Sequence, residues 1–188
     1  MFHPARAGFK SDFVALPLNF DQDHFALFGL PRRFAMDADL LDRKYRELQR
    51  EVHPDRFATA GDAEKRLSVQ RAAHLNDAYI TLKTPLRRAR YLLELSGVDA
   101  GVETDTAMPR DFLMEQMEWR EALAEVDAPA GLDELENRLA GRLEAEYSIM
   151  AAQLGQADNG AARDTLRKLM FLEKLREDIA GAYEAMES

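Results

Sequence analysis

Apolar residues recur at spacings of three and four along most of this 188-residue chain. In the longest run, the residues that keep this spacing are Leu132, Leu135, Leu139, Leu143, Tyr147, Met150 and Leu154. The spacing is that of an α-helix, and it gathers these side chains on one face, as a core between packed helices requires. The sequence lacks the alternation of apolar and polar residues that is typical of strands. We therefore predict an all-α fold.

The N-terminal half predicts an antiparallel helical hairpin. Its first helix begins at Asp37, a good N-cap residue, and is ended by Pro54. The apolar face of this helix consists of Leu41, Tyr45, Leu48 and Val52. The second helix is closed by Pro85, and its apolar face consists of Leu67, Leu75, Ala78 and Leu82. A short helical turn stopped by Gly29 precedes the hairpin, and a further helix over residues 87–95 follows it.

The best candidate boundary between domains is the stretch over residues 97–108, which has few periodic apolar residues and two glycines. Three helical patterns follow it, separated by short loops, which indicates a small bundle. These patterns cover residues 109–126, 132–154 and 162–186. The predicted organisation is an N-terminal extension (1–20), a hairpin domain (21–96), a linker (97–108) and a C-terminal helical bundle (109–188).

The net charge of −9 is divided unequally along the chain. Residues up to Ser96 carry 16 Lys and Arg against 13 Asp and Glu, a net of +3, whereas the remainder carries 9 against 21, a net of −12. Halves of opposite sign favour two different partners, because charge complementarity steers encounter and suppresses wrong pairings. The basic surplus is too small to favour nucleic-acid binding.

Several classes of function are excluded by composition. The chain has no cysteine, which excludes disulfides, thiolate metal sites and cysteine nucleophiles. Its histidines (His3, His24, His53 and His74) have no ligand spacing, and it lacks a glycine-rich phosphate loop and a nucleophile–base pair. We therefore predict no metal, no cofactor, no catalytic residue and no enzymatic activity.

Apolar runs of the roughly 20 residues needed to cross a bilayer do not occur in the sequence. The first ten residues also lack the apolar stretch of a secretory signal. We expect a cytoplasmic protein without a membrane partner. An organellar targeting peptide is the alternative, because this opening is weakly basic.

The tripeptide His53-Pro54-Asp55 lies where the first hairpin helix ends. By itself it is a helix stop, because proline ends helices and aspartate favours turns. Arg43, Arg46 and Arg50 precede it, about 180° from the apolar face, so we expect them to face solvent. Such a stripe is by default a solvated surface. It points away from the hairpin partner and ends beside the tripeptide, which favours a surface for a protein partner.

A second candidate surface lies on the helix predicted over residues 109–126. At 100° per residue, its buried face consists of Phe112, Trp119, Leu123 and Val126. The residues outside that face are Leu113, Met114 and Met117, with Glu118, Glu121 and Glu125 continuing along the same side. Either neighbouring helices bury Leu113 and Met117, or the stripe binds a protein partner through apolar anchors and charges. Phe171, at the edge of the core face of its own helix, belongs with the stripe.

Together these features resemble a J domain. The matching segments follow the family's order over about residues 21–95 and are the FGLP turn, LDRKYRELQREVHPDRF and LNDAYITLKTPLRRARYLL. Three further segments are similar to HscB-type co-chaperones of iron–sulfur cluster assembly, namely PLRRARYLLELSG, DFLMEQMEWREALAEV and LRKLMFLEKLR. The resemblance extends over essentially everything after Asp21. It implies an N-terminal J domain, which is an antiparallel helical hairpin, joined to a C-terminal three-helix bundle.

The resemblance also implies a function. The chain would stimulate the ATPase of an HscA/DnaK-type chaperone and deliver an IscU-type iron–sulfur scaffold protein to it, promoting cluster assembly and transfer. Chaperone binding falls on His53, Pro54 and Asp55, to which the helix geometry adds Arg43, Arg46 and Arg50. Scaffold binding falls on an apolar part, Leu113, Met117 and Phe171, and an acidic part, Glu118, Glu121 and Glu125.

Two alternatives remain open. One is a J-protein that serves other clients. The other is a hydrolase that uses paired carboxylates such as Glu118 and Glu121, although a carboxylate pair on a helix surface lacks the enclosed pocket that such chemistry needs.

Overall fold

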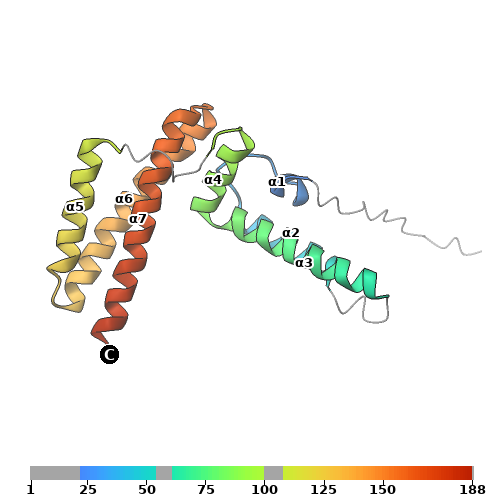
Figure 1. Cartoon of the computed structure of the whole chain (residues 1–188), viewed down its shortest axis with the longest axis horizontal. Coiled ribbons are helices and arrows are strands. Elements are labelled where there is room, and N and C mark those ends of the chain that lie inside the picture. The colour runs from blue at the N-terminus through green and yellow to red at the C-terminus, as the bar shows by residue number, and fades with distance from the viewer. Residues whose placement is uncertain (1–21, 54–60, 100–107, 188) are drawn as a thin grey trace, which may run out of the picture.

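The computed structural model describes residues 22–53, 61–99 and 108–187, and within these ranges the only regular elements are helices (Figure 1). In chain order they are α1 (His24–Leu27), α2 (Ala38–Val52), α3 (Asp62–Lys83), α4 (Pro85–Leu95), α5 (Arg110–Ala124), α6 (Pro129–Gly155) and α7 (Asn159–Met186). The all-α prediction is confirmed. Helices α2 and α3 form a long hairpin on one side, and α5, α6 and α7 form a bundle on the other (Figure 1).

The helix ends follow from local sequence. The Asp37 carboxylate accepts a hydrogen bond from the Leu40 N–H at 3.0 Å and so caps α2, as predicted. Helix α2 ends at Val52, and His53 takes an extended conformation (φ −59°, ψ 128°), which suits a residue before proline. Helix α1 is closed by Gly29 at φ +63°, a left-handed conformation that glycine adopts without strain.

The hairpin buries its own apolar core. Its fully or nearly fully buried side chains are Phe25, Leu27, Phe28, Leu30, Leu41, Val52, Leu75, Ala78, Leu82 and Leu92. One predicted core position is wrong, because Leu67 is 44% exposed and Ser68 is buried instead. The reason is helical phase: Leu67 is eight residues before Leu75, about 80° away around the helix, whereas the seven-residue offset of Ser68 returns within about 20°.

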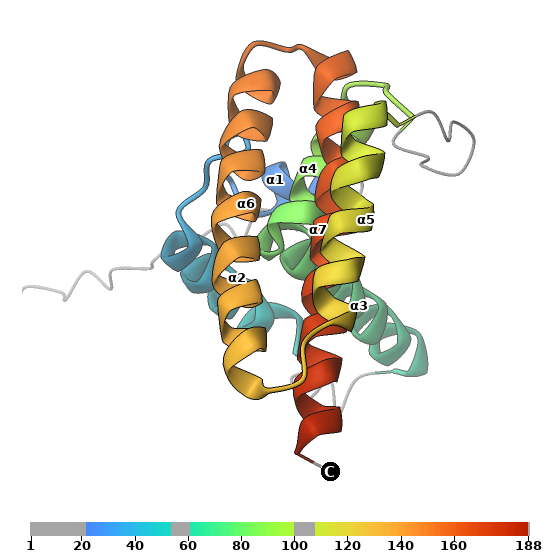
Figure 2. The ribbon, with the colours of Figure 1, turned by 90° about the vertical axis from the view of Figure 1, so that its left-hand side faces the viewer.

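The C-terminal helices pack side by side along most of their length, with α6 and α7 in the most extensive contact (Figure 2). Buried leucines of α6 (Leu132, Leu135, Leu139 and Leu143) meet those of α7 (Leu166, Leu169, Leu172 and Leu175). Helix α5 adds two buried aromatic side chains, Phe112 and Trp119. The core of the three-helix bundle is therefore formed mainly by the predicted apolar row of α6 and by the buried leucines of α7.

Helix α4 links the hairpin to the bundle. Leu92 belongs to the hairpin core, whereas Ala89 and Leu93 belong to the bundle core. Next to them, the buried Arg88 donates a hydrogen bond to the Leu82 carbonyl at 2.6 Å and lies 4.9 Å from the centroid of the Phe34 ring. The division into domains at residues 97–108 remains a prediction, since α4 packs into both cores and residues 100–107 lie outside the described part.

Candidate partner-binding surfaces

The first candidate surface is the solvent face of α2. Arg43, Arg46 and Arg50 are all exposed, as the helical phase predicted, and Leu41 and Val52 are buried on the opposite side. The three guanidinium groups lie on successive turns that lead towards His53. This face carries charge and offers little apolar area, so it suits a partner whose surface is acidic.

His53 is exposed at the end of α2. The other two residues of the tripeptide, Pro54 and Asp55, lie outside the described residues. The role assigned to all three residues therefore remains a prediction. What the structure adds is the place of His53, which lies in continuation of the arginine face and outside the hairpin core.

A polar and aromatic clamp fixes the orientation of α2 on α3. The rings of Tyr45 and Tyr79 stack with centroids 4.1 Å apart, and the Tyr79 hydroxyl donates to Asp42 at 3.0 Å. Lys83 pairs with the same carboxylate at 2.6 Å, and this hydrogen bond is the main reason that the pKa of Asp42 is lowered. The clamp occupies one side of α2, which leaves the arginine face directed away from α3.

The second candidate surface is the exposed side of α5. Leu113 is 44% exposed and Met117 is 61% exposed, which excludes the alternative that neighbouring helices bury them in this chain. Met114 between them is also exposed, as are Glu118, Glu121 and Glu125. Large apolar side chains exposed together beside carboxylates are typical of a protein-binding site.

Phe171 connects this surface to α7. It is half-buried and packs edge-on against Phe112, with ring centroids 5.7 Å apart. Arg120, which was not predicted as part of a site, lies 5.9 Å from the Phe171 ring. Its helical phase could have indicated it, because Arg120 follows Leu113 by seven residues and so lies within about 20° of the same direction.

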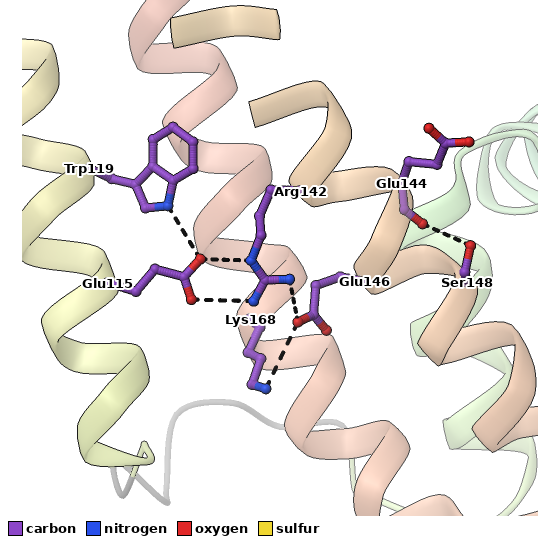
Figure 3. A network of polar contacts seen from close by, with 7 residues as sticks. All are labelled: Glu115, Trp119, Arg142, Glu144, Glu146, Ser148 and Lys168. Atoms are coloured by element: carbon purple, nitrogen blue, oxygen red, sulfur yellow. Dashed lines mark hydrogen bonds and ion pairs between the residues drawn. The ribbon is translucent and has the colours of Figure 1, made fainter. Parts of the chain in front are cut away.

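A network of charged side chains lies on the inner side of α5, in contact with α6 and α7 (Figure 3). Arg142 makes a two-pronged contact with Glu115, with Nε–Oε1 2.7 Å and Nη2–Oε2 3.2 Å, and it pairs with Glu146 at 2.6 Å. Trp119 Nε1–H donates to Glu115 at 3.4 Å, and Lys168 Nζ lies 3.9 Å from Glu146. The hydrogen bonds from Arg142 are the largest cause of a lowered pKa at Glu115.

This network is not predicted by the sequence pattern. Glu115 and Arg142 are 27 residues apart and lie on different helices. A helical wheel places each of them beside a core face but gives no sign that they meet, because pairing depends on the register of α5 against α6. The only available signal was the position of Glu115 next to the buried face of its own helix.

Within residues 22–53, 61–99 and 108–187, no group of three or more His, Asp or Glu side chains is arranged to hold a metal ion. His24 and His74, which are distant in sequence, have ring centroids 5.7 Å apart, and His24 also stacks on Tyr91. The helices of this same part are all too short or too polar to cross a membrane.

The described part of the chain is thus a helical hairpin with a basic exposed face, joined to a helical bundle with an apolar and acidic exposed face. Residues 108–180 match the HSCB C-terminal oligomerisation domain. The chain is 49% identical over 177 residues to the co-chaperone protein HscB homolog of Azoarcus sp. strain BH72, covering 92% of this chain and all of that one.

Solved structures agree with this relationship. The chaperone HscB from Vibrio cholerae aligns with a TM-score of 0.78 at 40% identity, covering 88% of this chain and 99% of that chain. The human co-chaperone protein HscB aligns with a TM-score of 0.83 at 34% identity, covering 86% of this chain and 82% of that chain. The chain therefore belongs to the HscB family of co-chaperones.

Proposed function

We propose that this chain is an adaptor of iron–sulfur cluster assembly. It stimulates the ATPase of an HscA/DnaK-type chaperone through the end of α2 and delivers an IscU-type scaffold protein that is bound on α5 and Phe171. The cluster is held by the scaffold, so the chain needs no cofactor of its own. The single observation that carries the proposal is that both candidate surfaces are exposed while the helices that bear them are packed into separate cores.

The chaperone-binding part rests on the arginine face. Arg43, Arg46 and Arg50 are exposed on one side of α2, and His53 continues this side beyond the last turn. Long-range attraction between this face and an acidic chaperone surface increases the rate of encounter. His53, Pro54 and Asp55 then bias the bound chaperone towards the state that hydrolyses ATP and holds its client.

The scaffold-binding part rests on the chemistry of α5. Leu113, Met117 and the edge of Phe171 provide apolar contact area, which supplies most of the affinity in protein interfaces. Glu118, Glu121 and Glu125 add negative charge along the same helix, which selects a basic partner and fixes its register. Met117 suits such an apolar contact because the methionine side chain adapts to irregular surfaces.

Coupling follows when one molecule of the adaptor carries both partners. Binding the scaffold on α5 raises its effective concentration at the chaperone that is bound on α2. Hydrolysis of ATP is then stimulated when a client is present, and the chaperone captures the scaffold and promotes transfer of the cluster. The alternative of a J-protein for other clients lacks this dependence on the scaffold.

The test is the steady-state ATPase rate of the chaperone with the adaptor, with the scaffold, and with both. We expect the adaptor and scaffold together to stimulate the rate by more than the product of their separate effects. An unrelated unfolded client protein, added in place of the scaffold, distinguishes the proposed adaptor from a J-protein for other clients. Equal stimulation by both clients would support the J-protein for other clients and contradict the proposed function.

A further inference from the structure

Helix α5 has a narrow apolar attachment to the bundle. Its buried side chains are Phe112 and Trp119, seven residues apart and therefore within about 20° of the same direction. Leu123 is only half-buried. Ala122 and Val126 are likewise only partly buried against the same core. With only two buried side chains, this stripe holds the helix against α6 and α7 but resists rotation about the helix axis weakly.

Glu115 supplies the missing constraint. Its carboxylate receives two hydrogen bonds from Arg142 of α6 and one from Trp119. Planar two-pronged contacts between arginine and carboxylate fix orientation as well as distance. Glu115 is two residues from Leu113 and two from Met117, so it lies about 160° around the helix from each of them. Fixing this side of α5 therefore fixes the direction in which the apolar side chains point.

Arg142 is in turn held by its own neighbours. Glu146, whose side chain is only 3% exposed, pairs with Arg142 at 2.6 Å and lies 3.9 Å from Lys168 of α7. Lys168 Nζ also lies 5.8 Å from the centroid of the Phe112 ring, and Phe112 packs against Phe171. The four charged side chains thus connect α5, α6 and α7 and extend to the base of the exposed surface (Figure 3).

Such a cluster is poorly suited to provide stability alone, because the desolvation of charges offsets much of their attraction. Its better-attested role is to select one arrangement among several that pack equally well. From this geometry we propose that Glu115 and Arg142 are positioning residues, which set the rotation of α5 so that Leu113 and Met117 are aligned with Phe171 of α7 and preorganised for the scaffold protein. This inference rests on the proposed function for the identity of the partner.

The rotation of α5 is measurable without any partner. The chain has no cysteine, so Met114→Cys on α5 and Ala140→Cys on α6 give a unique pair of sites for spin labels. Electron–electron resonance then reports the distribution of distances between the two helices. We expect a narrow distribution in the parent chain and a broad one in Glu115→Leu, a change that leaves Arg142 paired with the buried Glu146.

Scaffold affinity, measured by calorimetry on the chain without labels, is the second readout. Loss of preorganisation should weaken binding about tenfold in Glu115→Leu. Arg142→Lys keeps the charge between the two carboxylates but loses the two-pronged geometry. Binding should therefore weaken about threefold, and the width of the distance distribution should lie between those of the parent chain and Glu115→Leu. The matched control is Lys174→Met, which removes two exposed ion pairs from α7, with Glu177 and Asp178, and should change neither readout.

Two results would overturn the inference: an unchanged distance distribution in Glu115→Leu, or a broadened distribution with unchanged affinity. Circular dichroism, together with a cooperative thermal unfolding transition, checks that the variant remains folded. If the parent chain failed to bind the scaffold, the proposed function would be contradicted instead. The widths of the distance distributions in the parent chain and in Glu115→Leu would still decide whether Glu115 sets the rotation of α5.

Discussion

Helices α2 and α5 both carry exposed candidate surfaces, yet they differ in what they expose and in how they are held. The exposed face of α2 presents three arginines, whereas that of α5 presents apolar side chains followed by three glutamates. Helix α2 is fixed by stacked tyrosines and the Asp42–Lys83 pair, and α5 by two buried aromatics and the Glu115–Arg142 pair.

This difference indicates two modes of recognition. A surface of charge alone gives fast, salt-sensitive encounter with modest affinity, which suits a transient stimulatory contact. Apolar anchors give slower dissociation, which suits holding a client until it is transferred. The following predictions test whether the two surfaces act separately and in these two modes.

The largest effect is expected at the end of α2. Changing His53 to Gln should reduce stimulation of the chaperone ATPase to the basal rate, because His53 lies where the arginine face meets the loop. The fold and scaffold binding should be unaffected, since His53 is exposed at the end of α2, which packs on α3 in the hairpin. Single-turnover ATP hydrolysis gives the first quantity, and calorimetric titration with the scaffold gives the second. Full stimulation by His53→Gln would remove the tripeptide from the proposed mechanism.

The second prediction concerns the apolar part of the other surface. Changing Leu113, Met117 and Phe171 to alanine should weaken scaffold binding about a hundredfold, since each truncated anchor contributes roughly 1 kcal/mol. The chaperone ATPase stimulated by the adaptor alone should not change. Binding is measured by calorimetry, and helical circular dichroism checks the fold.

Leu67→Ala is the matched control for this variant. Leu67 and Leu113 have the same exposure, 44%, but Leu67 lies on the hairpin. If Leu67→Ala weakened scaffold binding as much as the triple variant, the assignment of the site to α5 would be wrong.

Much of this architecture was predictable from the sequence because it depends on local periodicity. The faces of α2 and α5 follow from 100° per residue, which predicts the exposure of Arg46 and Met117 and the burial of Trp119. The same rule explains why Leu67 is exposed against prediction, since a spacing of eight residues places it about 80° around the helix from Leu75.

Contacts between distant helices were not predictable in this way. The pairing of Glu115 with Arg142 and the approach of His24 to His74 depend on how helices are registered against one another. The double role of α4 is similar: its sequence predicts a helix, but only packing reveals that Leu92 and Leu93 enter different cores. The positions of Pro54 and Asp55 fall outside the described residues, so their role is still a prediction.

The third prediction separates the two surfaces by their response to salt. Changing Arg43, Arg46 and Arg50 to glutamine should weaken chaperone binding about tenfold at low ionic strength, mainly by slowing association. Raising the salt concentration should weaken binding of the parent chain and narrow its difference from the variant. Association and dissociation rates measured by biolayer interferometry at several salt concentrations provide the test.

Scaffold binding should depend less steeply on salt, because apolar contacts carry most of its affinity. The comparison between the surfaces would be contradicted if scaffold binding lost more affinity than chaperone binding over the same range of salt concentration. A variant that lowers chaperone affinity equally at all salt concentrations would show that the arginines act by short-range contact instead.

The smallest effect is a pH-dependent change in stability at α5. The pKa of Glu115 is lowered from its ordinary value of 4.5, first because Arg142 donates hydrogen bonds to the carboxylate. Because the pKa of Glu115 is lower in the folded state than in the unfolded state, its carboxylate stabilises the fold at pH values above the pKa of the unfolded state. This contribution is lost as the pH falls through the pKa of the folded state. Glu115→Gln should therefore lower the Tm by about 2 °C at pH 7 and have progressively less effect below pH 4.5.

Differential scanning calorimetry between pH 7 and pH 3 measures this difference. Glu177→Gln is the control, since that side chain is 71% exposed in its ion pair with Lys174 and solvent screens the interaction. The Tm difference for Glu115→Gln could instead stay constant as the pH falls. This result would mean that the packing and hydrogen-bond geometry of the Glu115 side chain, and not its charge, secure α5 in the parent chain. In that case the Glu115–Arg142 contact would hold α5 as a neutral hydrogen bond does, through its geometry and packing.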